Sequence, residues 1–365
     1  MRLPVRSALA STLILIANQV VADSTPADLN HWLRITPPPP ALSAPATRES
    51  WTVERQRIRG RLEQLLGDFP PRPPVPVVHT VAREDHGTFQ VERFTFENGL
   101  GDTVPGVLIL PTHRSGRLPA LLYCHWHGGE YQGGKSEVFE NRHTPEVPAA
   151  ALAARGYAVL AIDAPCFGER NGRGPDGTRD AAGEQSASKY HLWYGHSLWG
   201  ALLRDDRMAL DYLLSRPEID PARIGVTGIS MGATRSWWLM ALDERIRAGV
   251  AVACLTRYQD LIAKGGLRHH GIYYFVPGML RQFDTESVIA LAAPRPLLCL
   301  TGGKDDGSPA AGIQRIEAAV RPIWRLTGRD GGFESVIYPE LGHVYTPEMW
   351  RRMLAWFDSE LHPQP

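Results

Sequence analysis

A serine stands at the centre of the stretch GISMG, residues 228–232, with a glycine two positions away on either side. The stretch follows an apolar run typical of a buried strand and precedes a run of helix-forming residues. Two glycines in this arrangement let backbone and helix pack closely around a sharp strand-to-helix turn, which exposes the serine hydroxyl. The same turn directs the backbone N–H of Met231 toward a carbonyl under attack. The pattern therefore predicts that Ser230 is a nucleophile.

A serine hydroxyl reacts only with the help of a base, which an acid must orient. His343 follows the last predicted strand and precedes the final predicted helix, and Asp305 follows the strand before. The chain order Ser, Asp, His is the order of the nucleophile-elbow hydrolases. We expect His343 to accept the Ser230 proton and to return it to the leaving alkoxide, while Asp305 holds the imidazole tautomer. Asp306 is the alternative acid, although the spacing within its turn favours Asp305.

The predicted reaction passes through a tetrahedral oxyanion, which needs N–H donors. The stretch HWHGGEYQGG, residues 125–134, follows the first strand of the expected parallel sheet, where a second donor is required. The backbone N–H groups of His127 and Gly128 are the candidates to complete an oxyanion hole with that of Met231.

A metal site is the alternative interpretation of this histidine-rich stretch. His125 and His127 alternate on a strand-like segment and could bind a metal together with His269 and His270. No Asp, Glu or Cys stands nearby at a familiar zinc spacing. We therefore expect neither a metal nor a cofactor.

Side chains around the predicted nucleophile are candidates for substrate contact. Aromatic clusters more often form core than binding surface, so we expect part of this group to be packing. For Arg170 and Arg235 we expect either contact with a polar substrate or an ion pair inside the protein. The candidate pocket aromatics are Trp126, Trp193, Tyr194, Tyr273 and Tyr274.

The elements that must position these residues predict an α/β fold. From Leu118 onward, continuous apolar runs alternate with helical patterns, which is typical of a mostly parallel sheet covered by helices on both faces. Residues 48–117 predict a surface helix and antiparallel strands. Residues 255–294 are too long for a simple crossover, and we expect them to form a small cap over the site. Residues 48–365 are thus expected to be a single domain.

The N-terminus carries a targeting pattern. Arg2 and Arg6 precede a short apolar run that ends in small residues at Ala22, so residues 1–22 predict a secretory signal peptide. The run is short for a membrane span, and an uncleaved anchor helix is the alternative. Residues 23–47 contain TPPPP and predict a stiff Pro-rich linker. We expect a secreted protein, periplasmic or extracellular, without a stable membrane anchor after cleavage.

Composition excludes some partners. The chain has 39 Lys and Arg residues against 39 Asp and Glu residues and no basic block, so nothing indicates nucleic-acid binding. Its cysteines lie in or just after apolar strand-like runs, which favours buried free thiols over disulfides. They are Cys124, Cys166, Cys254 and Cys299.

These motifs together resemble the α/β-hydrolases of the dienelactone hydrolase and acetyl xylan esterase-like group. The resemblance spans about residues 88–360. It implies a mostly parallel sheet of about eight strands, a Ser230–Asp305–His343 triad and cleavage of carboxylic esters without a cofactor. Dienelactone hydrolases use a cysteine nucleophile, so the serine favours an esterase. The matching stretches are HWHGGEYQGGKSE, LAARGYAVLAIDAPCFGER, RPEIDPARIGVTGISMG, HGIYYFVPGML, LAAPRPLLCLTGGKDD and GHVYTPEM.

The sequence thus predicts a secreted serine esterase that acts on small acyl esters of small molecules or carbohydrates. Trp126 replaces the glycine usual in an H-G oxyanion stretch and is expected to alter the acyl pocket. One alternative is a serine peptidase of the prolyl-oligopeptidase kind, although the roughly 90 residues before the catalytic region are too few for its usual propeller. The other alternative is a catalytically silent binding protein on the same fold.

Overall fold

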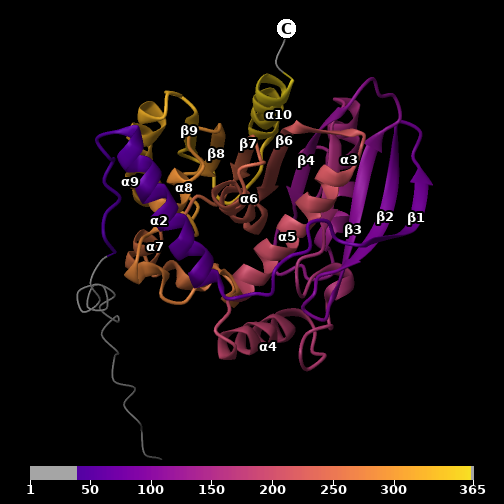
Figure 1. Ribbon diagram of the computed structural model, residues 1–365, viewed down its shortest axis with the longest axis horizontal. Coiled ribbons are helices and arrows are strands. Elements are labelled where there is room, and N and C mark those ends of the chain that lie inside the picture. The colour runs from indigo at the N-terminus through magenta and orange to yellow at the C-terminus, as the bar shows by residue number, and fades with distance from the viewer. Residues whose placement is uncertain (1–38, 363–365) are drawn as a thin grey trace, which may run out of the picture.

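One sheet of nine strands runs through the part of the chain described by the computed structural model, residues 39–362 (Figure 1). The strand order is β1-β2-β3-β5-β4-β6-β7-β8-β9. The pairs β1–β2, β2–β3 and β3–β5 are antiparallel, and the remaining pairs are parallel. The strands are β1 (Val78–Asp85), β2 (Phe89–Glu97), β3 (Thr103–Pro111), β4 (Leu118–Cys124), β5 (Ala158–Ile162), β6 (Ile219–Ile229), β7 (Ala248–Val252), β8 (Leu297–Gly302) and β9 (Phe333–Tyr338).

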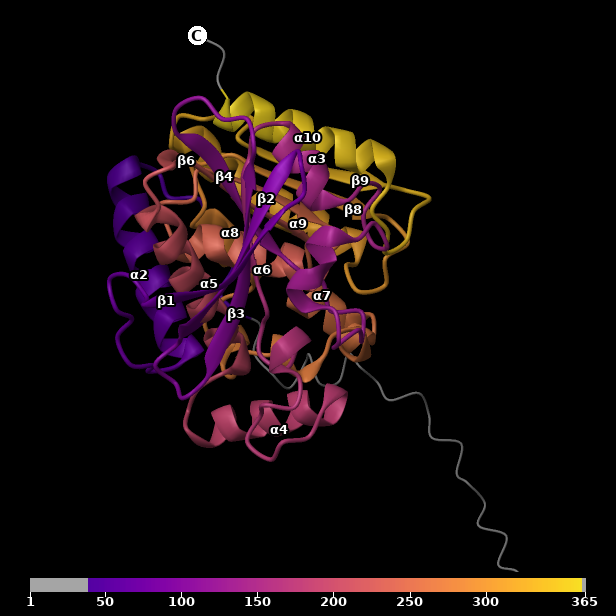
Figure 2. The same cartoon turned by 90° about the vertical axis from the view of Figure 1, so that its right-hand side faces the viewer.

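Helices cover both faces of this sheet, and a separate apolar core fills each side (Figures 1 and 2). One core joins the sheet to α2, α5, α6, α8 and α9, and the other joins it to α3 and α10. The central strands β4, β5, β7 and β8 are buried along their whole length, as parallel strands between two helical layers must be. The helices are α2 (Arg48–Leu66), α3 (Pro148–Ala154), α4 (Asp180–Trp193), α5 (Leu198–Ser215), α6 (Met231–Leu242), α7 (Tyr258–Ala263), α8 (Thr285–Ala290), α9 (Ala310–Leu326) and α10 (Pro347–Leu361).

The architecture matches the predicted alternation of strands and helices, with two differences. The sheet has nine strands instead of the roughly eight that the family resemblance implies, and the antiparallel strands predicted within residues 48–117 are β1, β2 and β3, of which β1 forms the polar and largely exposed edge. The sequence also gave no sign of α4. Its buried positions hold small or polar residues, so it lacks the apolar stripe by which an amphipathic helix is recognised; these are Gly183, Glu184, Ala187 and Ser188.

The predicted cap segment, residues 255–294, only partly covers the site. It consists of α7, α8 and three short 3₁₀ turns, η3 (Gly266–His269), η4 (Ile272–Tyr274) and η5 (Met279–Arg281). Most of α8 packs into the core beside α6, whereas η3 and η4 reach the carboxyl edge of the sheet. The predicted signal peptide lies outside the described residues, as does most of the predicted linker. Within the described residues, no helix combines the length and apolarity needed to cross a membrane.

Arginines fasten α2 to the main body. Arg48, Arg55 and Arg59 are spaced so that they lie on one side of the helix, and each donates to a carbonyl at the C-terminal end of another helix, α9, α8 and α6 respectively. These carbonyls have no partner within their own helices, and cations are favourable at that end of the helix dipole. Glu244 pairs with both Arg55 and Arg59. The arginine-rich face of α2 therefore serves packing.

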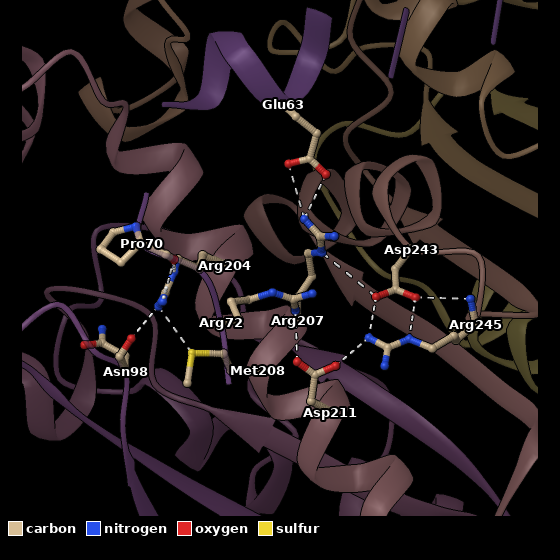
Figure 3. A network of polar contacts seen from close by, with 10 residues as sticks. All are labelled: Glu63, Pro70, Arg72, Asn98, Arg204, Arg207, Met208, Asp211, Asp243 and Arg245. Carbon is tan, nitrogen blue, oxygen red and sulfur yellow. Dashed lines mark hydrogen bonds and ion pairs between the residues drawn. The ribbon is translucent and has the colours of Figure 1, made fainter. Parts of the chain in front are cut away.

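A second polar network ties the segment between α2 and β1 to α5 and α6, as Figure 3 shows. Arg204 of α5 donates to the carbonyls of Pro70 and Asn98. Asp211, two turns further along α5, accepts from Arg72 at 3.1 Å and from Arg245 at 2.6 Å. Arg207 of α5 pairs with Glu63 and Asp243, and Asp243 also pairs with Arg245.

Arg170 and Arg235 form internal ion pairs, which settles the choice left open by the sequence. Arg235 of α6 makes a bidentate contact with Asp206 of α5, at 2.5 and 2.9 Å, and the two side chains are 1% and 0% exposed. Arg170 pairs with Asp102 and Asp205 at 2.7 and 2.8 Å. All four cysteines are free and buried.

The buried Arg235–Asp206 pair gives a stability prediction. Arg235→Met leaves the Asp206 carboxylate buried without a partner, and we expect the free energy of unfolding to fall by about 3–5 kcal/mol. The double variant Arg235→Met/Asp206→Leu removes both charges and should recover most of that loss. Urea titration followed by tryptophan fluorescence measures both changes. A double variant less stable than the single variant would contradict this interpretation of the pair.

Candidate active site

Ser230 occupies a strained turn between β6 and α6. Its φ of +59° and ψ of −117° lie outside the regions that non-glycine residues ordinarily adopt. The turn is held on both sides, because the Ser230 N–H donates to the Val252 carbonyl of β7 at 2.9 Å and the Thr234 N–H donates to the Ser230 carbonyl at 3.0 Å. Such a conformation persists only where its surroundings enforce it.

The two flanking glycines are required by the close approach of β4. A Cβ atom on Gly228 would lie 2.2 Å from the carbonyl oxygen of Cys124, and one on Gly232 would lie 2.0 Å from the same atom. Real side chains do not tolerate such distances, so the end of β4 can lie against this turn only if both positions are glycine.

Ser230, His343 and Asp305 form a continuous chain of hydrogen bonds. His343 Nε2 lies 2.8 Å from Ser230 Oγ, and His343 Nδ1 lies 2.8 Å from Asp305 Oδ2. Because Nδ1 faces a carboxylate it carries the ring proton, which leaves Nε2 to accept from the serine hydroxyl. The Asp305 side chain is 3% exposed, whereas His343 is 37% exposed and open to the site. Asp306, the alternative acid, is exposed and forms no hydrogen bond with His343 in the described chain.

Two loops deliver the acid and the histidine, and backbone hydrogen bonds join them. The Gly303 N–H donates to the Tyr338 carbonyl at 2.7 Å, and the Lys304 N–H donates to the Leu341 carbonyl at 2.8 Å. The second oxygen of Asp305 accepts a backbone N–H from two residues further on, at 3.0 Å. The loop after β8 and the loop after β9 are thus fixed relative to each other at the carboxyl edge of the sheet.

Met231 is the first residue of α6, so its backbone N–H has no carbonyl within the helix to which it could donate. Among the described residues it has no hydrogen-bond acceptor. It directly follows the serine, where an oxyanion donor is needed.

The loop after β4 leaves two further N–H groups available. The Trp126 N–H donates to Glu137 Oε2 at 2.7 Å, and the Gly129 N–H donates to His127 Nδ1 at 3.0 Å. The N–H groups of His127 and Gly128 have no acceptor among the described residues. The loop therefore presents the two donors that the sequence nominates for an oxyanion hole.

Trp126 shapes this loop through its ring. A Cβ atom on Gly128 would lie 2.3 Å from the Trp126 indole, and Gly128 has a φ of +50°, so glycine is required there on both counts. The indole also stacks on His143, with 3.5 Å between ring centroids. Trp126 is thereby held at the wall of the candidate site.

Glu137, which the sequence analysis did not single out, is a buried carboxyl beneath the loop. Besides the Trp126 N–H, it accepts the Tyr123 hydroxyl at 2.6 Å. Burial raises the pKa of Glu137 to about 7, against the lowering effect of these hydrogen bonds and of Arg235, and Glu130 adds to the rise. Glu137 therefore titrates near neutral pH at the base of the oxyanion loop.

Two of the histidines considered as metal ligands, His125 and His270, have backbone partners instead. His125 is fully buried and its pKa lies well below the ordinary value because of burial. Its Nδ1–H donates to the Trp126 carbonyl at 2.7 Å, and its Nε2 accepts the Ala164 N–H at 3.1 Å, so both nitrogens are engaged. His270 contacts the Gly307 carbonyl at 3.0 Å. The described residues contain no group of three or more potential ligands that could hold a metal.

A cavity of about 550 Å³ opens over Ser230 and His343. Trp126, Tyr273 and the candidate oxyanion residues line it, and so do residues of η3 and the loop after β8 that the sequence analysis did not single out. Its lining consists of Trp126, His127, Gly128, Gly129, Ser230, Met231, Cys254, Arg268, His269, His270, Gly271, Tyr273, Lys304, Asp305, Asp306, Gly307, Ser308 and His343.

Three of the candidate pocket aromatics lie elsewhere, which corrects the expectation from the sequence. Trp193 and Tyr194 lie at the C-terminal end of α4 and are 94% and 65% exposed, because that helix projects from the body instead of folding over the site (Figures 1 and 2). Tyr274 is buried behind the cavity, stacked on His270. Trp193 and Tyr194 were chosen because they precede the long helix α5 in sequence, but that position does not indicate in which direction α4 runs.

Comparison with known proteins adds to this geometry. The model of the Abhydrolase family matches residues 24–319. The putative hydrolase YtaP of Bacillus subtilis (strain 168) is 35% identical over 294 residues, which cover 80% of this chain and 95% of YtaP. The lasso peptide isopeptidase AtxE2 of Asticcacaulis excentricus is 27% identical over 73% of this chain, which spans 37% of that protein's length.

Among solved structures, a putative acetyl xylan esterase from Bacteroides fragilis NCTC 9343 is similar in fold. It has a TM-score of 0.70 and 21% sequence identity, over 90% of this chain and 93% of that one. These likenesses confirm the fold class and the family resemblance that the sequence indicated.

The buried carboxyl of Glu137 yields a pH prediction. Its folded pKa of about 7 exceeds the ordinary 4.5, so the unfolded chain releases this proton at lower pH than the folded chain does. This contribution to the free energy of unfolding is complete below pH 4.5 and is lost as the pH rises to 7. Glu137→Gln accepts the Trp126 N–H through its amide oxygen, can donate its NH2 to the Tyr123 hydroxyl oxygen as the protonated acid would, and does not titrate. The stability of the variant relative to the wild type should therefore rise by a few kcal/mol between pH 4.5 and 7.

Urea titrations of both proteins from pH 4 to 8.5 measure this difference. Glu130→Gln is a suitable control, because Glu130 is also acidic and close but is half exposed and contacts Arg142 and His143. A stability difference between Glu137→Gln and the wild type that stays constant with pH would contradict the prediction.

Proposed function

The chain belongs to the Abhydrolase family, and from this premise we propose that it is a serine esterase. It cleaves carboxylic esters of small acyl groups through an acyl-enzyme intermediate. The observation that carries the proposal is the hydrogen-bonded chain of Ser230, His343 and Asp305 beside uncommitted backbone N–H groups.

In the acylation step, Ser230 Oγ attacks the ester carbonyl carbon while His343 Nε2 takes the hydroxyl proton. The carbonyl oxygen becomes an oxyanion that accepts the N–H groups of Met231 and of His127 or Gly128; each such donor is typically worth about 10²–10³ in rate. Collapse of the intermediate expels the alkoxide, which receives its proton from His343. Asp305 stabilises the imidazolium in between.

In the deacylation step, water replaces the alcohol and the same residues act again. His343 removes a proton from water, the resulting nucleophile attacks the acyl carbonyl, and Ser230 leaves with the proton from His343. Neither step calls on a metal or a redox group, so the chain's own residues suffice.

The walls of the cavity support a small acyl group and a polar alcohol. Trp126 occupies the wall beside the candidate oxyanion donors, where it limits the space for an acyl chain. The lining also includes Arg268 and His269, whose hydrogen-bonding groups suit a polyhydroxylated alcohol such as a sugar. The similarity in fold to a putative acetyl xylan esterase is in keeping with an acetylated carbohydrate.

A peptidase is the second candidate, because one relative is named a lasso peptide isopeptidase. The two functions differ in the leaving group, since an amine must be protonated before it can depart. Comparing p-nitrophenyl esters with p-nitroanilides of the same acyl group distinguishes them, and we expect the esters to be preferred. The predicted signal peptide over residues 1–22 supports the further proposal that the enzyme acts outside the cytoplasm.

Ser230→Ala removes the proposed nucleophile, so we expect kcat on p-nitrophenyl acetate to fall by at least about 10³-fold. Asp305→Asn should lower kcat by a similar order, because the imidazole then loses its partner and tautomer. Asp306→Asn is the matched control and should retain kcat within a few fold, since Asp306 does not contact His343. Equal losses at 305 and 306, or an active Ser230→Ala, would contradict the proposed roles.

Trp126→Ala tests the proposed limit on acyl length. The wild type should prefer p-nitrophenyl acetate to the hexanoate, and removal of the indole should shift the ratio of kcat/KM toward the hexanoate by about tenfold or more. His143→Ala removes the ring stacked behind Trp126 without touching the cavity wall and should shift the ratio much less. An unchanged ratio in Trp126→Ala would show that another wall sets acyl length.

A further inference from the structure

Glu184 of α4 is a buried carboxylate that contacts His127, one of the residues lining the candidate active site. Its side chain is 4% exposed, and its Oε2 lies 2.7 Å from Nε2 of His127. The other oxygen lies against Gly271 of the cap segment, where a Cβ atom would approach it to 2.8 Å. A carboxylate is costly to bury without strong partners, so this placement requires a reason.

The hydrogen bonds of His127 define its tautomer. The Gly129 N–H donates to Nδ1 at 3.0 Å, so Nδ1 is the unprotonated nitrogen and Nε2 carries the proton. Nε2–H therefore donates to Glu184. Both ring nitrogens are engaged inside the protein, so neither is free to hydrogen-bond a substrate, although His127 lines the cavity. Its imidazole serves to hold structure.

Aromatic rings fix the remaining freedom of this imidazole. Tyr273 of the cap segment stacks on it with 4.7 Å between centroids and 20° between planes. Tyr131 and Phe167 meet it edge-on at 5.1 and 5.0 Å. The ring is therefore held by α4, the cap segment and its own loop at once.

The backbone that follows His127 consists of two glycines, which restrict its conformation little. They are Gly128 and Gly129, whose φ values are +50° and +77°, and the loop carries the two uncommitted N–H groups at the site. Oxyanion stabilisation depends on donors held in place before the charge develops. Glu137 holds the loop at the Trp126 N–H, so the two N–H groups that follow need a second anchor on their far side from β4 or on the His127 side chain itself.

We propose that Glu184 is a positioning residue of the oxyanion hole: its carboxylate holds the His127 ring, and the ring aims the N–H groups of His127 and Gly128. The inference rests on the proposed esterase function. It gives α4 a role in the reaction and links the cap segment, through Tyr273, to the same anchor.

The test compares two replacements of Glu184. Glu184→Gln still offers an oxygen to Nε2–H and should keep kcat on p-nitrophenyl acetate within about threefold of the wild type. Glu184→Leu offers none, so we expect kcat to fall by about 10- to 100-fold while KM changes by less than about threefold. Ser188→Ala, at a buried position one turn further along α4, is the matched control and should leave both constants unchanged.

A transition-state mimic separates positioning from general structural damage. A trifluoromethyl ketone bonds to Ser230 Oγ, the serine proton passes to His343, and the ketone oxygen becomes an oxyanion in the same hole. Its affinity should fall in Glu184→Leu by the same factor as kcat/KM, and Glu184→Gln should restore it. Retained affinity together with a raised KM would overturn the inference.

A variant of the histidine itself covers the case in which Glu184→Leu does not fold. His127→Phe keeps a ring against Tyr273 but removes both nitrogens, and it should lower kcat by a similar factor. Where both single variants fold, the double variant should be no worse than either, because the two residues act through one contact. Additive losses, or full activity in His127→Phe, would overturn the inference. A wild type without esterase turnover would instead overturn the proposed function.

Discussion

The contact between the end of β4 and the turn after β6 is the constraint on which the rest of the site depends. The Cys124 carbonyl lies so close to positions 228 and 232 that neither tolerates a Cβ atom. Together with the backbone hydrogen bonds of Ser230 to Val252 and Thr234, this close packing holds Ser230 in a backbone conformation that it would not adopt alone, at the wall of the cavity. The same β4 end leads directly into the loop with the candidate oxyanion donors. One close approach thus sets nucleophile and donors relative to each other.

The remaining parts are attached to this centre by hydrogen bonds of two kinds. Backbone hydrogen bonds join the loops after β8 and β9, so the acid and the histidine are fixed relative to each other. Buried carboxylates hold the loop after β4, with Glu137 at Trp126 and Glu184 at His127. Preorganisation of this kind places the cost of ordering the donors in folding instead of in the reaction. The cap segment takes part through a stacked ring, so the cavity wall and the donors share one support.

The sequence was informative where function depends on local pattern and was silent where it depends on distant contacts. The glycines around Ser230, and the positions of Asp305 and His343 after successive strands, predicted three residues that the fold brings into hydrogen-bonding distance. The continuous apolar runs predicted the parallel strands, and the alternating pattern within residues 48–117 predicted the antiparallel strands beside them. Helix α4 was not predicted, because its buried face is small and polar. The directions of Trp193 and Tyr194 could therefore not be predicted either. Glu137 and Glu184 carried no local signal, since the contact of Glu184 with His127 spans 57 residues.

Mapping the adduct of a fluorophosphonate probe by mass spectrometry tests the central claim most directly, because the probe reports which atom is nucleophilic. The account predicts a single phosphonyl group on the peptide that contains Ser230, with labelling lost when His343 is replaced by alanine. An adduct on another residue, or labelling of Ser230 that proceeds equally fast without His343, would contradict it.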